Sequence, residues 1–121
     1  MVKQVDVVVI DDDEGIRWIF QQALGLCNLS CLTVGDGAQG VKDVIRCNPR
    51  LVIVDVKLGA MNGFEVVRQI RQTNTGVKIL FVTGYRETIT EGWAAEENIL
   101  GVLEKPFNIT ELLEIITEIF G

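Results

Sequence analysis

Short apolar runs that each lead into polar residues are the feature that most constrains this chain. The runs cover residues 7–10, 51–54, 79–82 and 102–103, and they lead into Asp11–Asp13, Asp55, Thr83 and Glu104-Lys105. Unbroken apolar runs of this length are typical of parallel strands that are buried on both faces. Because ligands bind outside the carboxyl ends of such strands, we expect the polar residues to meet at one edge of a sheet.

Helical patterns separate the apolar runs and set the fold class. Strands are expected at 5–10, 30–34, 51–54, 77–82 and 100–103. Helices with one apolar face are expected after the caps Asp13 and Asn108, from Asp36, and after a turn at Asn62-Gly63. The second of these helices should end at Asn48-Pro49. Regular alternation of strand and helix predicts a doubly wound, three-layer α/β domain of five right-handed βα units.

The segment 86–98 is the weakest helical pattern of the chain. Ile89 and Trp93 are one turn apart, but Gly92 lies between them, and glycine costs about 1 kcal/mol relative to alanine inside a helix. Two interpretations stay open. The segment is either a moving part beside the functional edge, since switching elements come from the less stable part of a fold, or a poorly packed surface helix.

Composition excludes several classes of function. A chain of 121 residues predicts one domain, residues 1–121. The net charge of −6, with no basic cluster, argues against direct binding of nucleic acid. No apolar stretch approaches the ~20 residues that span a bilayer, and Asp6 and Asp11 interrupt any signal-peptide core. The sequence therefore predicts a cytoplasmic protein, or the cytoplasmic part of a larger one, without membrane contact of its own.

The cysteines do not indicate a metal site. Cys27, Cys31 and Cys47 are odd in number, and the chain has no histidine. A zinc site and a disulfide framework are both disfavoured. We expect the three residues to be small packing side chains in a reducing compartment.

The acidic residues at the strand ends predict a cation site. Asp11, Asp12 and Asp55 should converge, and two carboxylates ~4 Å apart repel by about 4 kcal/mol at an effective dielectric constant of ~20. Oxygen ligands select a hard ion such as Mg²⁺. A carboxylate beside that ion can act as a nucleophile towards phosphorus. Lys105 would supply an ammonium and Thr83 a hydroxyl to the phosphoryl oxygens.

With these features, the whole chain resembles the receiver domain of two-component response regulators. The resemblance rests on Val8–Glu14, on Val54-Asp55 with Leu58, Met61 and Gly63, on Val82–Tyr85, and on Lys105–Phe107. It implies a flavodoxin-like (βα)5 fold with the parallel strand order 2-1-3-4-5.

The resemblance also implies a role for each site residue. Asp55 would be the phosphoacceptor, and Asp12 and Asp55 would bind Mg²⁺ directly. Asp11 would act mainly through water, and the carbonyl of Lys57 would complete the ligands. Asp13 falls outside the acidic pair and is expected to be a helix cap.

The same resemblance implies how the site would switch. Lys105 would pair with the phosphoryl group, and Thr83 would be drawn to it. The bond between Lys105 and Pro106 would be cis. A histidine kinase, or a histidine phosphotransfer protein, would donate the phosphoryl group. The signal would appear on the face made by the fourth helix, the fifth strand and the fifth helix. Such a domain promotes its own phosphorylation and dephosphorylation and is otherwise not an enzyme.

Three departures from the family pattern bear on the switch. Val102 stands where family members usually carry an aromatic residue or histidine, which leaves the switching mechanism open. Gly59 stands where proline is common, so we expect a looser loop over the site. Lys57 and Tyr85 occupy positions that tune water access to the acyl phosphate, and we expect both side chains to slow dephosphorylation.

Alternative functions belong to other classes. A haloacid-dehalogenase-like phosphatase would use Asp11 and Asp13, but the chain lacks the distal acidic pair and leaves Asp55 without a role. A receiver-like binding module that works without phosphorylation would keep the acidic pocket as a vestige. A flavodoxin-type cofactor carrier is disfavoured, because the acidic loop after the first strand would repel a phosphate.

Overall fold

The fold alternates strands and helices along the chain. The computed structural model describes residues 4–84, 96 and 98–121. The elements are β1 (Val7–Ile10), α1 (Glu14–Leu26), β2 (Cys31–Val34), α2 (Gly37–Cys47), β3 (Leu51–Asp55), α3 (Gly63–Arg71), β4 (Lys78–Thr83), β5 (Ile99–Glu104) and α5 (Ile109–Phe120). The expected helix at 86–98 lies almost entirely outside the described residues.

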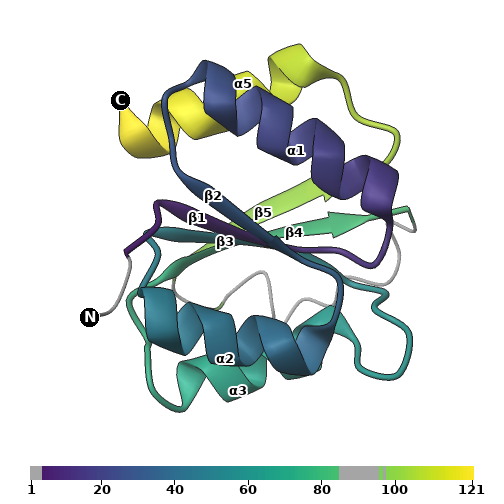
Figure 1. The fold of residues 1–121 in the computed structure, drawn as a ribbon, viewed down its shortest axis with the longest axis vertical. Helices are drawn as coiled ribbons and strands as arrows, with labels where there is room; N and C mark the ends of the chain where they lie inside the picture. The colour runs from purple at the N-terminus through teal and green to yellow at the C-terminus, as the bar shows by residue number, and fades with distance from the viewer. Residues whose placement is uncertain (1–3, 85–95, 97) are drawn as a thin grey trace.

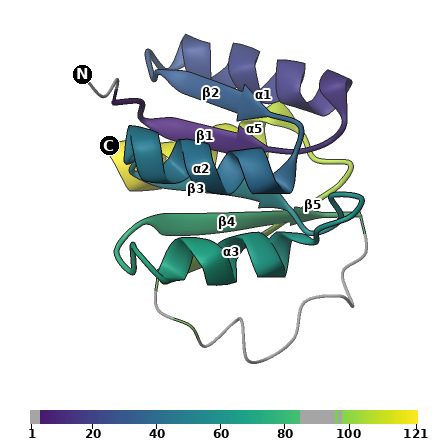
Figure 2. The ribbon, with the colours of Figure 1, turned by 60° about the horizontal axis from the view of Figure 1, so that its bottom comes forward.

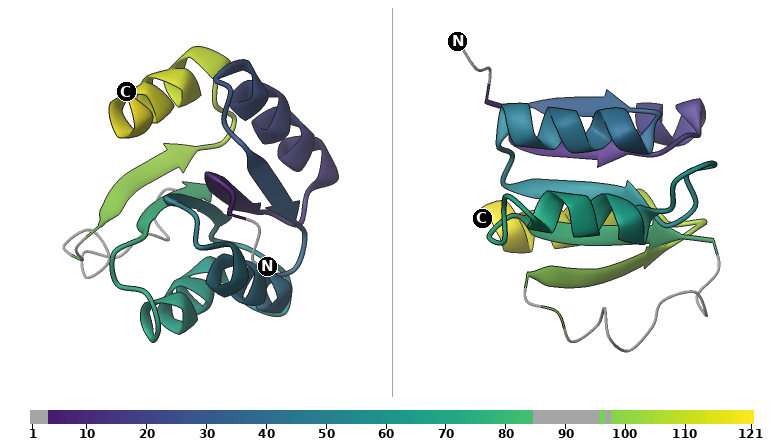
Figure 3. Two further views of the ribbon diagram at one scale, coloured as in Figure 1. Left: turned by 60° about the vertical axis from the view of Figure 1, so that its left-hand side comes forward. Right: turned by 90° about the horizontal axis from the view of Figure 1, so that it is seen from below.

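All described strands form one parallel sheet. The order is β2-β1-β3-β4-β5, which confirms the predicted topology (Figure 2). Residues Val7 to Ile10 of β1 pair in register with both β2 and β3, so β1 and β3 lie side by side. Figure 3 shows the strands pointing the same way, so their carboxyl ends share one edge.

Helices cover both faces of the sheet and give the three predicted layers. In Figure 1, α1 and α5 lie on one face, and α2 and α3 lie on the other. Alternate strand residues enter two separate cores, as the period of two along a strand requires. Val8 and Ile10 pack on the side of α2 and α3. Val7 and Val9 pack on the side of α1 and α5.

All four described helices begin at a side-chain cap, and the sequence predicts two of these caps, Asp13 and Asn108. The side chains of Asp13, Asp36, Asn62 and Asn108 each accept a hydrogen bond from the backbone N–H three residues later, at 2.7–3.1 Å. These bonds satisfy amide groups that lack a partner inside the helix. The assignment of Asp13 as a cap is confirmed. Asn48 closes α2 in the left-handed region, with φ of 46°.

Three strands extend beyond their predicted ends. Asp55, Thr83 and Glu104 are the last residues of β3, β4 and β5. The apolar pattern predicts that each of these strands ends at its last apolar residue. In the structure, however, Asp55 pairs with Val82, and Thr83 pairs with Glu104. Parallel pairing engages the backbone alone, so a polar side chain at the edge can remain in the ladder.

The cysteines are free thiols. Cys47 is buried in the core, and burial raises the pKa of the Cys31 thiol to about 12. Among the described residues, no helix is both long and apolar enough to cross a bilayer.

Candidate functional site

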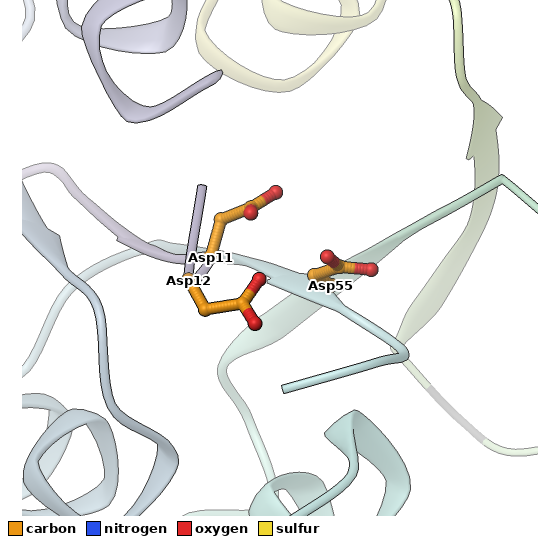
Figure 4. A group of neighbouring side chains, drawn as sticks. All are labelled: Asp11, Asp12 and Asp55. Carbon is orange, nitrogen blue, oxygen red and sulfur yellow. The ribbon is translucent and has the colours of Figure 1, made fainter. Parts of the chain in front are cut away.

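Three carboxylates lie together at the carboxyl edge of the sheet. Asp11 and Asp12 directly follow β1, and Asp55 ends the neighbouring strand β3. One oxygen of each carboxylate lies within 4.8 Å of the others. Figure 4 shows the three side chains side by side. The structure therefore brings together the acidic residues that the strand ends predicted to converge.

Burial and backbone contacts hold two of these carboxylates. Asp11 is 1% exposed and Asp55 is 6% exposed, whereas Asp12 lies at the surface. Asp11 Oδ1 accepts a hydrogen bond from the Asp13 N–H at 2.9 Å. Asp55 Oδ1 accepts one from the Lys57 N–H at 3.2 Å. Each of the two turns thus fixes the orientation of one carboxylate.

Lys105 is the countercharge of the buried acids. Its Nζ lies 3.0 Å from Asp11 Oδ2 and donates a hydrogen bond of 3.1 Å to Asp55 Oδ2. Burial lowers the pKa of Lys105, but its contacts with Asp11 and Asp55 outweigh burial and raise that pKa above its ordinary value. Burial raises the pKa of Asp11, and repulsion from Asp55 adds to the effect. One ammonium therefore serves two buried carboxylates.

The acidic cluster fits a hard divalent cation. Asp11 Oδ2 is buried and accepts no hydrogen bond from the described residues. Among these residues, its ion pair with Lys105 is what offsets the cost of burying its negative charge. Asp12 offers a third carboxylate from the solvent side. An oxygen-only donor set with an open side suits Mg²⁺, which keeps several of its waters. These residues can hold the predicted ion.

Thr83 and Lys105 come from the two strands beyond β3. Asp55 pairs in register with Val82, so Thr83 lies one residue further along the same edge, and its side chain is buried. The Lys105 N–H donates to the Thr83 carbonyl at 2.8 Å. The Lys105–Pro106 peptide bond is cis, the isomer expected from the sequence. The hydroxyl and the ammonium are thus delivered to the same edge as the acids.

The residues that depart from the family pattern differ in where they lie relative to the acidic cluster. Lys57 is exposed beside Asp55, and Tyr85 lies outside the described residues. Gly59 has φ of +73°, a conformation that glycine permits and that the proline ring cannot adopt. Val102 is 38% exposed on β5. The loop that follows Asp55 therefore takes a path here that proline at position 59 would not allow.

Two contacts were not anticipated from the sequence. Gly63 begins α3 so close to β3 that an added Cβ would meet the Asp55 carbonyl oxygen at 2.3 Å. Gly63 was part of the motif, but nothing in the sequence showed why it must be small. Arg17 on α1 donates from Nη1 to the Asp11 carbonyl at 2.8 Å. No sequence signal separates this arginine from an exposed helical one.

The sequence matches the family model of the response regulator receiver domain over residues 7–117. The chain belongs to the response regulator receiver family. The match spans all nine described elements except the end of α5, and it includes the acidic cluster, Thr83 and Lys105.

Curated relatives are similar across most of this receiver domain. The DNA-binding transcriptional regulator NtrC of Escherichia coli K12 is 27% identical over 110 residues, which cover 91% of this chain and 24% of NtrC. The response regulator MprA of Mycobacterium leprae is 31% identical over 108 residues, which cover 88% of this chain and 47% of MprA. The chain thus spans about a quarter to a half of the length of these relatives.

Solved structures share the fold over nearly their full length. The chemotaxis response regulator CheY4 of Vibrio cholerae is 27% identical, with a TM-score of 0.85, and the match covers 98% of this chain and 100% of that one. The response regulator TrrA of Thermotoga maritima, solved in complex with Mg²⁺-BeF, is 27% identical with a TM-score of 0.83. The TrrA match covers 97% of this chain and 100% of the other.

Proposed function

We propose that this receiver domain is a switch that accepts a phosphoryl group on Asp55 in the presence of Mg²⁺. The observation that carries the proposal is the ion pair between Lys105 and a buried Asp55 carboxylate inside the acidic cluster. A histidine kinase or a histidine phosphotransfer protein would be the donor. An O–P bond forms at Asp55 as the N–P bond of the donor's phosphohistidine breaks.

Asp11, Asp12 and Asp55 are the residues that would hold Mg²⁺, together with the carbonyl of Lys57. The bound ion would neutralise charge on the carboxylates and on the incoming phosphoryl oxygens. TrrA, which shares this fold, was solved with Mg²⁺-BeF, and that complex supports the assignment. Asp12 is the exposed member of the cluster, so it can bind an ion that arrives from solvent.

Lys105 and Thr83 would respond to the new charge. A phosphoryl group on Asp55 brings close to two negative charges beside the Lys105 ammonium, which already contacts that carboxylate at 3.1 Å. The Lys105 N–H donates a hydrogen bond to the Thr83 carbonyl. A displacement of either residue would therefore move the ends of both β4 and β5. The output would be a shift of the face that includes β5 and α5; the predicted contribution of a fourth helix to that face falls on 86–98, almost entirely outside the described residues.

The domain would act as one unit, residues 1–121, with no separate substrate to turn over. Its partners would be the phosphoryl donor and a downstream protein or output domain. The net charge of −6 disfavours direct binding of nucleic acid by this domain itself. A cytoplasmic location follows from the proposed donor.

Intact mass after incubation with acetyl phosphate tests the proposal. We expect one phosphoryl addition to the wild type with Mg²⁺, none in excess EDTA, and none in Asp55→Ala. No addition, under conditions that modify a receiver of known activity, would favour the binding module that works without phosphorylation. Repeated release of phosphate from a small phosphate ester would instead favour the phosphatase.

Lys57 and Tyr85 are proposed to slow hydrolysis of the acyl phosphate. Lys57 lies in the loop that follows Asp55, and its backbone N–H donates a hydrogen bond to Asp55 Oδ1. We expect Lys57→Asn and Tyr85→Ala each to shorten the phosphoryl half-life several-fold, because a smaller side chain admits water to the acyl phosphate. Loss of the added mass over time gives the half-life. An unchanged half-life in both variants would contradict the role.

A further inference from the structure

Arg17 reaches the acidic cluster without binding a carboxylate. It lies in the second turn of α1, and its Nη1 donates to the carbonyl of Asp11 at 2.8 Å. That carbonyl belongs to the peptide group that joins Asp11 to Asp12. Guanidinium groups pair readily with carboxylates, and the Asp11 side chain belongs to a cluster of three. No ion pair of Arg17 is found among the described residues, so its charge leaves the candidate ligand oxygens untouched.

The backbone around Asp11 is held from several directions. Its N–H donates to the Val34 carbonyl at 3.0 Å, which continues the ladder between β1 and β2. Its side chain holds the Asp13 N–H at 2.9 Å. Arg17 fixes the remaining group, the carbonyl. The plane of the Asp11–Asp12 peptide, which determines where the Asp12 side chain emerges, is therefore tied to α1.

Gly35 makes room for this arginine. It follows β2 directly, and a Cβ built on it would lie 2.8 Å from Arg17 Nη1 and 3.3 Å from Cζ. The guanidinium is thus packed against the backbone of the loop between β2 and α2. Arg17 joins that loop to the turn that carries the two acids. A methyl group at position 35 would displace the guanidinium from this place without removing the positive charge of Arg17.

We propose that Arg17 is a positioning residue for the cation site: it holds the Asp11–Asp12 peptide, and Gly35 is the space that allows it. The inference rests on the proposed function, because it concerns the Mg²⁺ ligands. Arg17 could change the affinity of the site for Mg²⁺ in either of two opposite directions. As a nearby positive charge, Arg17 would repel Mg²⁺. As a positioning group, it would strengthen Mg²⁺ binding.

Two single variants and their combination separate these effects. Arg17→Met removes the donor and the charge, whereas Gly35→Ala keeps the charge and displaces the donor. Mg²⁺ alone is titrated, and binding is followed by the NMR shifts of backbone amides in the acidic turn. We expect each variant to weaken Mg²⁺ binding about five- to ten-fold, which corresponds to the net contribution of about one hydrogen bond. The double variant should be no weaker than the weaker single variant, since both remove one contact.

Arg46→Met is the matched control, because it removes one arginine charge from α2, where the Arg46 side chain is 54% exposed and pairs with Asp43. It should bind Mg²⁺ as the wild type does. The inference is overturned if Arg17→Met binds Mg²⁺ more tightly, or if both variants lose thermal stability in EDTA while their Mg²⁺ affinity stays unchanged. A wild type that binds no Mg²⁺ and takes no phosphoryl group would refute the proposed function itself.

Discussion

Gly63→Ala is expected to lower the free energy of unfolding by about 3 kcal/mol, an overpacking effect at the upper end of the usual range. The added Cβ would meet the Asp55 carbonyl oxygen at 2.3 Å and the Val56 Cα at 3.0 Å. All of these atoms are backbone, so no side chain can rotate away. The Gly63 N–H also donates to the Val56 carbonyl at 2.8 Å, which keeps α3 against β3. The end of β3 or the start of α3 must therefore move.

Urea denaturation followed by circular dichroism measures this loss. Gly25→Ala is the matched control, since Gly25 is exposed on α1 and a Cβ there meets nothing within 4 Å. The control should gain about 0.5–1 kcal/mol, because alanine is the better helix former. The two substitutions are chemically identical, so their opposite signs isolate the contact with β3. Equal stabilities would show that the backbone accommodates the methyl group.

A second readout ties this contact to the site. Displacement of the Asp55 backbone should slow phosphorylation of Gly63→Ala by acetyl phosphate at temperatures where the variant remains folded. Gly25→Ala should be phosphorylated at the rate of the wild type. A destabilised variant that still accepts phosphoryl groups at the full rate would place the strain in α3 alone.

The strands and the helix starts could be predicted because short local patterns specify them: apolar runs for the strands and single polar residues for the helix starts. An apolar run such as 51–54 can only be buried, and a parallel sheet buried on both faces is the arrangement that accepts four such runs. Asp13 and Asn62 precede helical patterns, and their short side chains bond the amides of the first turn. The convergence of Asp11, Asp12 and Asp55 then follows from the topology, because strand ends meet at one edge.

Close approach and the sharing of charge could not be predicted. The pattern places Lys105 at the correct edge, but it does not show that one ammonium contacts both Asp11 and Asp55. The sequence pattern likewise gives no distance between Gly63 and β3, because that distance depends on how α3 packs against the sheet. Arg17 looks like any arginine on a helix until the fold brings the Asp11 carbonyl to it. These features depend on three-dimensional distances between segments far apart in the sequence.

Lys105→Met is expected to destabilise the metal-free protein and to strengthen its binding of Mg²⁺. Asp11 and Asp55 are buried, and Lys105 Nζ lies within 3.1 Å of an oxygen on each. Without it, two carboxylates face each other with no compensating charge. Removal of one partner of a buried ion pair typically costs about 3–5 kcal/mol. Because the Lys105 side chain is 22% exposed, we expect the lower part of that range.

The metal affinity should change in the opposite direction. In the wild type, Lys105 pairs with Asp11 Oδ2 and Asp55 Oδ2, so these two oxygens of the acidic cluster are already in contact with a positive charge. A cation that enters must compete with the ammonium or tolerate its charge. Methionine keeps the length of the side chain and removes both effects. We therefore expect Mg²⁺ to bind Lys105→Met about ten-fold more tightly.

Urea denaturation in EDTA and in saturating Mg²⁺ measures both effects together. Lys105→Met should lose stability in EDTA and recover most of it with Mg²⁺, since a ligand that binds only the folded state stabilises that state. Lys42→Met, which removes an exposed lysine charge on α2, should follow the wild type in both conditions. Weaker binding of Mg²⁺ to Lys105→Met would contradict this expectation. It would mean that the ammonium holds the carboxylates in position for the ion and does not compete with it. Phosphorylation by acetyl phosphate should still fall in Lys105→Met, because tighter metal binding does not replace the cation that we propose pairs with the phosphoryl group.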